Sequence, residues 1–168
     1  ALKDEVSKRN LKAQVGHVER YNPAYVGALS YALQPAFIES HRLSPFQPRG
    51  TDVSVILDLM IHDLDIVLSI IPAEVSYISA SGVNVISDNP DIASARIEFT
   101  NGAVANLTAS RMSLKKERKM RIFQRSAYLT VDFYNKKTNV FKMRDKEELS
   151  GENPYQMEIN PGDGQPSK

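Results

Sequence analysis

The sequence predicts an α+β domain built on one large, mainly antiparallel sheet. The chain carries helical patterns up to Pro72, whereas the part after Pro72 alternates apolar and polar residues and is rich in β-branched residues. Short turns join these extended segments, which favours antiparallel pairing of consecutive strands. With 168 residues, of which 42% are hydrophobic, the chain can bury one sizeable core.

Two helical and two extended segments are expected before the longest apolar stretch. The segment LKDEVSKRNLK, residues 2–12, reads as the end of a helix, and AQVGHV, residues 13–18, as a short strand. A helix is expected over 23–33, because a proline suits its first turn and Pro35 ends it before a strand over 36–42.

The longest apolar segment predicts a buried helix over residues 51–71. It follows the Pro-rich loop LSPFQPRG, and either Thr51 or Asp52 is expected to cap it. Pro72 lies just beyond its end, as is common after a helix. Charged residues within this stretch argue against a membrane span.

Six strands are expected after Pro72, and the tail from Gly151 is expected to be extended or disordered because it is rich in Gly, Pro and polar residues. The strands are EVSYISASGVNVIS (74–87), IASARIEF (92–99), AVANLTAS (103–110), MRIFQ (120–124), AYLTVDF (127–133) and NVFKM (139–143).

The TNG turn fixes one strand register. A three-residue loop with Gly102 in the left-handed conformation pairs Phe99 with Ala103 and puts apolar residues on one face, whereas a two-residue turn would mix apolar and polar residues on both faces. The three-residue loop is therefore predicted, and the polar face that it leaves can meet water or another subunit. That face consists of Ser94, Arg96, Glu98, Asn106, Thr108 and Ser110.

Charge and cysteine content narrow the function classes. Lys+Arg number 21 and Asp+Glu 20, so the net charge of +1 gives no field for steering nucleic acid or an anionic membrane, and neither partner is expected. Cysteine is absent, which excludes disulfides and thiolate chemistry and fits a reducing compartment. A cytoplasmic protein is expected.

The apolar helix carries a narrow polar stripe. At about 100° per residue, five polar side chains fall within an arc of roughly 80°, with Asp63 nearly opposite. Because the rest of the helix is apolar, the stripe is expected to face a polar cavity. Its members are Ser54, Asp58, His62, Asp65 and Ser69.

Asp58 and His62 stand one helical turn apart, within reach of one another or of a shared substrate atom. A carboxylate beside an imidazole fixes its tautomer and raises its pKa, which suits a proton acceptor near neutral pH. Spacing alone favours the plainer interpretation, an Asp–His pair satisfied within the core. A metal site is weaker still, because only His17 and His41 remain as further histidine ligands.

Three motifs in this order, VGHVERYNP, FIESHRLSPFQPRGTD and VILDLMIHDLDIVLS, resemble the C-terminal part of the Gfo/Idh/MocA family of NAD(P)-dependent sugar oxidoreductases. The likeness runs from about Leu2 to about Met143. It implies the open antiparallel sheet of the glucose-fructose oxidoreductase type, with helices packed on one face, and a preceding Rossmann domain. In that family the domain supplies much of the sugar site and often the subunit interface.

The resemblance also implies roles for the stripe. His62 corresponds to the family's catalytic histidine, which takes the proton from the sugar hydroxyl as hydride leaves, and Asp58 to the acidic partner that positions it or binds a neighbouring hydroxyl. Asp65, on the same stripe, is expected to bind substrate.

The first motif supplies further candidate residues for the cofactor and sugar site. Its position beside the nicotinamide in the family makes His17 a candidate for cofactor contact and Arg20, Tyr21 and Asn22 candidates for substrate contact. Arg20 fits a surface or helix-capping cation equally well.

Arg42 and Arg49 flank the Pro-rich loop and suit a phosphate or carboxylate on the substrate, since the guanidinium fork matches such groups; a salt bridge at the rim is the alternative for each. The residues of these motifs are most similar to those of bacterial family members that act on nucleotide-linked amino sugars such as UDP-N-acetylglucosamine. This substrate follows from the resemblance alone.

The chain departs from the family in lacking G-x-G-x-x-G and the E-K-P motif. Residues 1–16 are therefore expected to be a remnant of the end of a Rossmann domain, 17–150 the substrate-binding and dimerisation domain, and 151–168 a tail. NAD or NADP is expected to bind the full-length protein but not to bind this piece tightly, and the piece is expected to be inactive alone.

Two functions remain in competition. The first is the substrate-binding and catalytic-base half of a sugar dehydrogenase. The alternative is a non-catalytic binding or dimerisation module, in which the open sheet face joins a homo-oligomer and Asp58 and His62 are structural. The family uses this domain for both purposes, so the two are compatible.

Overall fold

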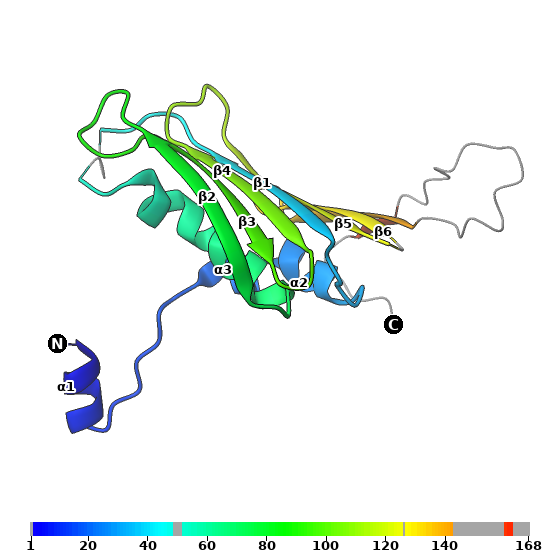
Figure 1. Ribbon diagram of the computed structural model, residues 1–168, viewed down its shortest axis with the longest axis horizontal. Coiled ribbons are helices and arrows are strands. Elements are labelled where there is room, and N and C mark those ends of the chain that lie inside the picture. Colours follow the sequence, from blue (N-terminus) through cyan, green and yellow to red (C-terminus); the bar gives the residue numbers. More distant parts are fainter. Residues whose placement is uncertain (1, 49–51, 126, 143–159, 163–168) are drawn as a thin grey trace, which may run out of the picture.

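The described residues form an eight-stranded sheet, and all of their helices except the first lie on one face of it (Figure 1). The computed structural model describes residues 2–48, 52–125, 127–142 and 160–162. The strands are β1 (Phe37–Leu43), β2 (Val75–Val83), β3 (Ile92–Phe99), β4 (Val104–Ser110), β5 (Glu117–Gln124), β6 (Ala127–Asp132), β7 (Lys137–Lys142) and β8 (Asn160–Gly162). The predicted α+β class with a large, mainly antiparallel sheet is confirmed.

Five helical segments are described. They are α1 (Leu2–Lys8), the 3₁₀ turn η1 (Val18–Tyr21), α2 (Pro23–Leu29), the π-helical η2 (Ile56–Met60) and α3 (Ile61–Ile70). None of them, within the described part of the chain, combines the length and apolarity needed to cross a bilayer. Helix α1 buries no side chain, and it stands apart from the sheet on an extended segment (Figure 1).

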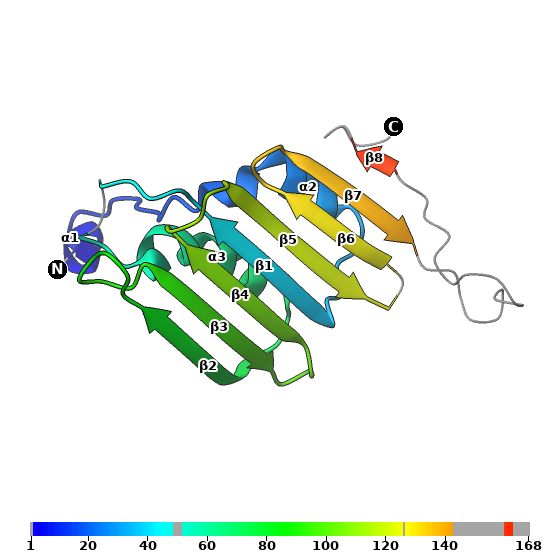
Figure 2. The same cartoon turned by 90° about the horizontal axis from the view of Figure 1, so that it is seen from above.

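The sheet consists of two antiparallel meanders joined by an inserted strand. The order is β2-β3-β4-β1-β5-β6-β7-β8, as Figure 2 shows for the first seven strands side by side. Strand β1 lies between the meanders, parallel to β4 and antiparallel to β5. The parallel pairing requires a long connection, and the segment carrying η2 and α3, followed by β2 and β3, supplies it.

The β3–β4 hairpin has the register predicted from the TNG turn. Ala95 pairs with Leu107 and Ile97 with Ala105, while the Phe99 amide donates to the Ala103 carbonyl at 2.9 Å. Gly102 has φ +84°, the left-handed conformation that this loop demands.

The core lies between the sheet and the helices. Ala95, Ile97 and Leu107 point to the helix-covered face and are buried, and Ile66 and Val67 of α3 are fully buried against that face. Of the predicted polar face, Ser94 and Arg96 are exposed, Glu98, Asn106 and Thr108 are partly exposed, and Ser110 is buried. Ser110 departs from the pattern because its hydroxyl accepts the Met112 amide at 3.0 Å where the chain leaves the sheet.

Several predicted boundaries are wrong. Residues 13–16 are extended but pair with no described strand, so the strand expected over 13–18 does not form. Helix α2 begins at Pro23 as predicted but ends at Leu29, and β2 stops at Val83 before a loop. The cap of the apolar helix also differs, since the helix starts later than predicted and Ser54 accepts the first free amides.

The tail expected from Gly151 falls mostly outside the described residues, apart from β8 (Asn160–Gly162), which pairs with β7.

Candidate functional site

The apolar helix changes type where its polar stripe begins. Residues 56–60 form a π turn, and the α-helix starts at Ile61. A π turn holds more residues than an α turn, so the arc calculated at 100° per residue does not hold for the stretch before Ile61. Such π segments often occur at functional sites, and this one places Asp58 just before the α-helical turn that carries His62.

His62 is half-buried, and its Nδ1 atom is buried without a hydrogen-bond partner in the described part of the protein. Burial lowers its pKa below the ordinary value of 6.5, and the nearby charge of Arg42 lowers it further. The imidazole is therefore neutral at pH 7 and able to accept a proton.

Asp58 is exposed, and no hydrogen bond or ion pair joins it to His62 among the described residues. The structure thus does not contain a direct Asp–His pair. The second geometry allowed by the sequence, in which the two side chains reach a shared substrate atom, remains a prediction.

Asp65 contacts two residues of the first motif, Arg20 and His17. Arg20 donates Nε and Nη2 to the two carboxylate oxygens of Asp65, each at 2.7 Å, and His17 Nε2 lies 3.8 Å from Oδ1. The hydrogen bonds from Arg20 hold the pKa of Asp65 below its ordinary value. The structure therefore brings three predicted residues, His17, Arg20 and Asp65, together beside the turn of α3 that carries His62.

Arg42 does not have the exposed position expected of an anion ligand. Its side chain is only 2% exposed, and all three guanidinium nitrogens donate to Asp63 or Glu19. The prediction of substrate contact is wrong because Arg42 forms a buried ion pair with Asp63, which lies on the face of the helix opposite the stripe. Arg49 lies outside the described residues.

The remaining two residues of the first motif have different environments. Tyr21 is 76% exposed and is free to contact a bound molecule. Asn22 accepts the Ala24 amide at 3.1 Å as the N-cap of α2 and donates to Glu19 and to the Phe133 carbonyl. Each polar atom of its amide is therefore engaged in a hydrogen bond within the protein.

Ser69 is the last residue of the stripe. Ser69 contacts the Tyr25 hydroxyl at 2.9 Å and donates to the Ile66 carbonyl, which ties α3 to α2. No group of three or more His, Asp or Glu side chains among the described residues is placed to hold a metal ion.

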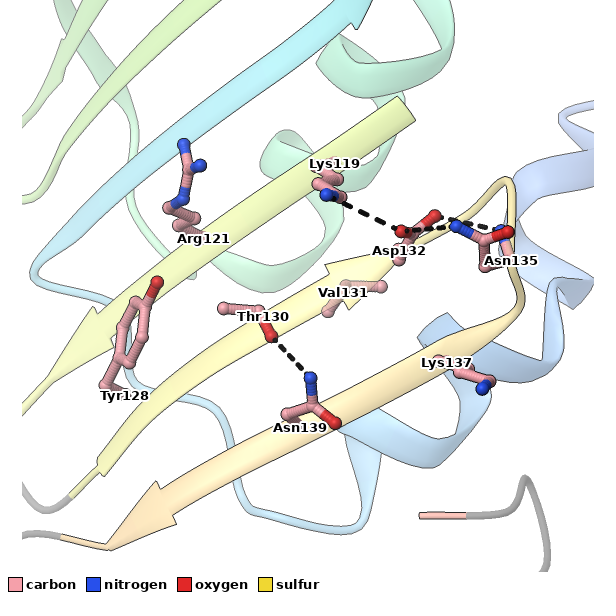
Figure 3. A pocket seen from close by; sticks show the side chains of 9 residues that line it. All are labelled: Lys119, Arg121, Tyr128, Thr130, Val131, Asp132, Asn135, Lys137 and Asn139. Carbon is pink, nitrogen blue, oxygen red and sulfur yellow. Dashed lines mark hydrogen bonds and ion pairs between the residues drawn. The ribbon is translucent and has the colours of Figure 1, made fainter. Parts of the chain in front are cut away.

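A hollow that the sequence did not reveal lies on the opposite, helix-free face. Its volume is about 480 Å³, and it lies over β5, β6 and β7 (Figure 3). Nζ of Lys119 lies 3.9 Å from Oδ2 of Asp132, and Nη1 of Arg121 donates to Oε2 of Glu39 at 2.9 Å. Alternation along β5 is the signal that could have found it, since Lys119 and Arg121 share one face. The lining residues are Lys119, Arg121, Tyr128, Thr130, Val131, Asp132, Asn135, Lys137 and Asn139.

Comparison with known proteins covers most of the chain. A family model described as the GFO/IDH/MocA C-terminal domain matches residues 34–130. A UDP-N-acetylglucosamine 3-dehydrogenase from Acidithiobacillus ferrooxidans is 41% identical over 143 residues, which is 84% of this chain and 45% of the relative. The chain therefore spans about half the length of this relative.

Solved structures give the same picture. The Acidithiobacillus ferrooxidans enzyme superposes with a TM-score of 0.77 at 39% identity, over 84% of this chain and 47% of that one. A levoglucosan dehydrogenase in complex with NADH and L-sorbose gives a TM-score of 0.75 at 18% identity, over 94% of this chain and 49% of that one, and shows the shared fold.

Proposed function

The chain belongs to the Gfo/Idh/MocA family, and we propose that it is the substrate-binding and catalytic-base half of an NAD(P)-dependent oxidoreductase acting on a sugar or nucleotide-sugar hydroxyl. The observation that carries the proposal is His62, a half-buried imidazole with a lowered pKa whose buried Nδ1 atom has no hydrogen-bond partner among the described residues. It stands where a π turn meets an α-helix, next to the cluster formed by Asp65 and two residues of the first motif, His17 and Arg20.

His62 acts as the general base in this proposal. A neutral imidazole accepts the proton of the sugar hydroxyl through Nε2, while the hydride leaves the carbon that bears this hydroxyl. The alcohol thereby becomes a ketone. Asp58, exposed at the preceding turn, binds a neighbouring hydroxyl or the same one. When bound, the nicotinamide supplies the hydride acceptor.

The residues of the first motif and Asp65 are assigned to the cofactor and the substrate. We assign His17 to contact with the nicotinamide and Tyr21, Arg20 and Asp65 to contact with the sugar, which the meeting of His17 and Arg20 at the Asp65 carboxylate supports. Arg49 is the remaining candidate for the phosphates of a nucleotide sugar.

A Gly-rich phosphate cradle does not occur in this sequence, so we assign dinucleotide binding to a Rossmann domain in the part of the relatives that the chain does not span. In this proposal residues 1–16 are a remnant of the end of that domain, and residues 17–150 are the substrate-binding and dimerisation domain. The 168-residue chain alone is expected to be inactive.

The test is the rate of NAD(P)H formation by the full-length protein with UDP-N-acetylglucosamine. His62→Ala should lower kcat by about 10²- to 10⁴-fold, the usual cost of losing a general base. His41→Ala is the matched control, because it removes an imidazole from the helix-free face and should leave the rate unchanged. Equal rates for the wild type and His62→Ala would remove His62 from the mechanism.

The helix-free face supports a second role in self-association. A row of aromatic rings crosses four strands there, with centroid separations of 5.8, 4.7 and 5.4 Å along Phe37, Phe123, Tyr128 and Phe141. Apolar area presented on a sheet face favours a second copy of the chain as partner. Sedimentation of the chain over a range of concentrations tests this homo-oligomer, and a strict monomer would exclude it.

A further inference from the structure

A buried ion cluster anchors the turn that carries His62. Arg42 of β1 donates Nε to both Asp63 oxygens at 3.1 Å and Nη2 to Oδ1 at 2.7 Å, while Nη1 donates to Glu19 Oε1 at 2.9 Å. Each of the three side chains is 10% exposed or less. Buried charges occur in proteins when they are paired in this way, so the geometry of all three is tightly constrained.

The cluster joins segments that are far apart in the sequence. Asp63 follows His62 directly in α3, Glu19 lies in η1, and Arg42 lies in the central strand β1. On the far side of Glu19, its Oε2 accepts from Asn22 Nδ2 at 2.9 Å, and Asn22 caps α2. One guanidinium therefore fixes α3, η1 and the start of α2 to the middle of the sheet.

We propose that Arg42 is a positioning residue for His62, holding the first turn of α3 at a fixed distance from the segment that carries His17 and Arg20. This inference rests on the proposed role of His62 as a base. A fork-shaped cation suits the task, because it binds Asp63 through two nitrogens and Glu19 through the third, which a lysine cannot reproduce.

The same groups set the charge around the imidazole. Charges on four elements act on His62: Arg42 on β1 and Arg118 on β5 lower its pKa, whereas Glu19 on η1 and Asp63 on α3 raise it. Asp65 lies on the same helix, accepts hydrogen bonds from Arg20 and lies near His17. The charge of His62 in turn lowers the pKa of Asp65. Burial remains the largest cause of the lowered pKa.

Substitutions in the cluster should therefore shift the pKa of His62 in opposite directions. Arg42→Met removes a cation and leaves two buried carboxylates, so the pKa of His62 should rise. Asp63→Asn keeps the side-chain shape and one acceptor but removes a negative charge, so the pKa should fall. A purely structural role predicts no such pair of opposite shifts.

The experiment measures kcat, KM and their pH dependence in the full-length protein, together with the ¹³C NMR titration of the His62 ring. Arg42→Lys, which keeps the charge but loses the fork, should lower kcat by about 10- to 100-fold with KM little changed, because small misplacements of a reacting group have effects of this size. The acidic limb of the kcat/KM profile should move up in pH in Arg42→Met and down in Asp63→Asn.

Two results would overturn the inference: unchanged kcat in Arg42→Lys, or an NMR titration of His62 that is the same in the wild type and Asp63→Asn. The second measurement needs no turnover. If His62→Ala turns over normally, the proposed function fails, and the NMR titrations still decide whether the cluster controls the imidazole. If Arg42→Met does not fold, Asp63→Asn and Arg42→Lys provide the same test.

Discussion

Replacing Arg42 with methionine should lower the free energy of unfolding far more than the same replacement on the open face. Methionine fills similar volume but leaves the buried Asp63 carboxylate without its cation, and it leaves Glu19 with only the more exposed Arg118, whose Nη1 lies 3.6 Å from Oε1. Removing one partner of a buried ion pair typically costs about 3–5 kcal/mol, mostly as the penalty of the uncompensated charge.

The chain contains a matched control for this prediction. Arg96 donates to Glu98 at 2.9 Å from a strand of the same sheet, but the two side chains are 46% and 40% exposed. Exposed pairs of this kind contribute about 0–1 kcal/mol, because water already solvates both partners. Arg96→Met should therefore be nearly neutral.

Urea unfolding followed by circular dichroism measures both variants. With a denaturant slope of about 2 kcal/mol per molar, the loss predicted for Arg42→Met moves the urea midpoint down by about 1.5–2.5 M. A double variant, Arg42→Met with Asp63→Leu, should recover part of that loss because one stranded charge is gone. Equal midpoints for Arg42→Met and Arg96→Met would refute the reasoning.

Two further predictions concern the loops. Asp91 accepts amides of three residues in its loop, and these bonds hold its pKa far below the ordinary 3.8, so its stabilising effect is present above pH 3.8 and lost as pH falls below it. Asp91→Asn should therefore flatten the dependence of unfolding free energy on pH between about 2 and 4. Asp88→Asn, at an exposed position in the same loop, is the control and should leave this pH dependence as it is in the wild type. Gly102→Ala should lower stability by about 1 kcal/mol, because φ is +84° there while nothing obstructs the added carbon. Gly27→Ala, equally unobstructed but helical, should be neutral or stabilising, and a thermal melt that ranks the two glycines the other way would contradict this account.

Local chemistry explains the elements that sequence reasoning predicted correctly. The β3–β4 register follows from Gly102 and from the alternation around it, since a shift by one residue would move every apolar side chain to the wrong face. Pro23 and Asn22 likewise define the start of α2 within a few residues of chain. Such features depend on neighbours in the sequence, so the pattern contains the information.

Other predictions failed because distant groups decide them. Residues 13–16 have the composition of a strand but pair with none of the strands that the structure describes, and the π turn at 56–60 changes the direction in which Asp58 faces. Arg42 reads as an exposed cation beside a Pro-rich loop, yet its carboxylate partners lie 21 and 23 residues away in the chain. Sequence spacing gives no sign of this pairing.

The amino-acid sequence alone determined the α+β class, the meander of strands after Pro72 and the imidazole on an apolar helix, because hydrophobic period and turn chemistry are local properties. The tertiary structure decided that β1 enters between the two meanders and that Arg42 is consumed by Asp63 and Glu19. It also decided that His17, Arg20 and Asp65 meet beside His62. Burial and long-range charge pairing arise only when segments far apart in the chain come together, and that is the information a single sequence does not state.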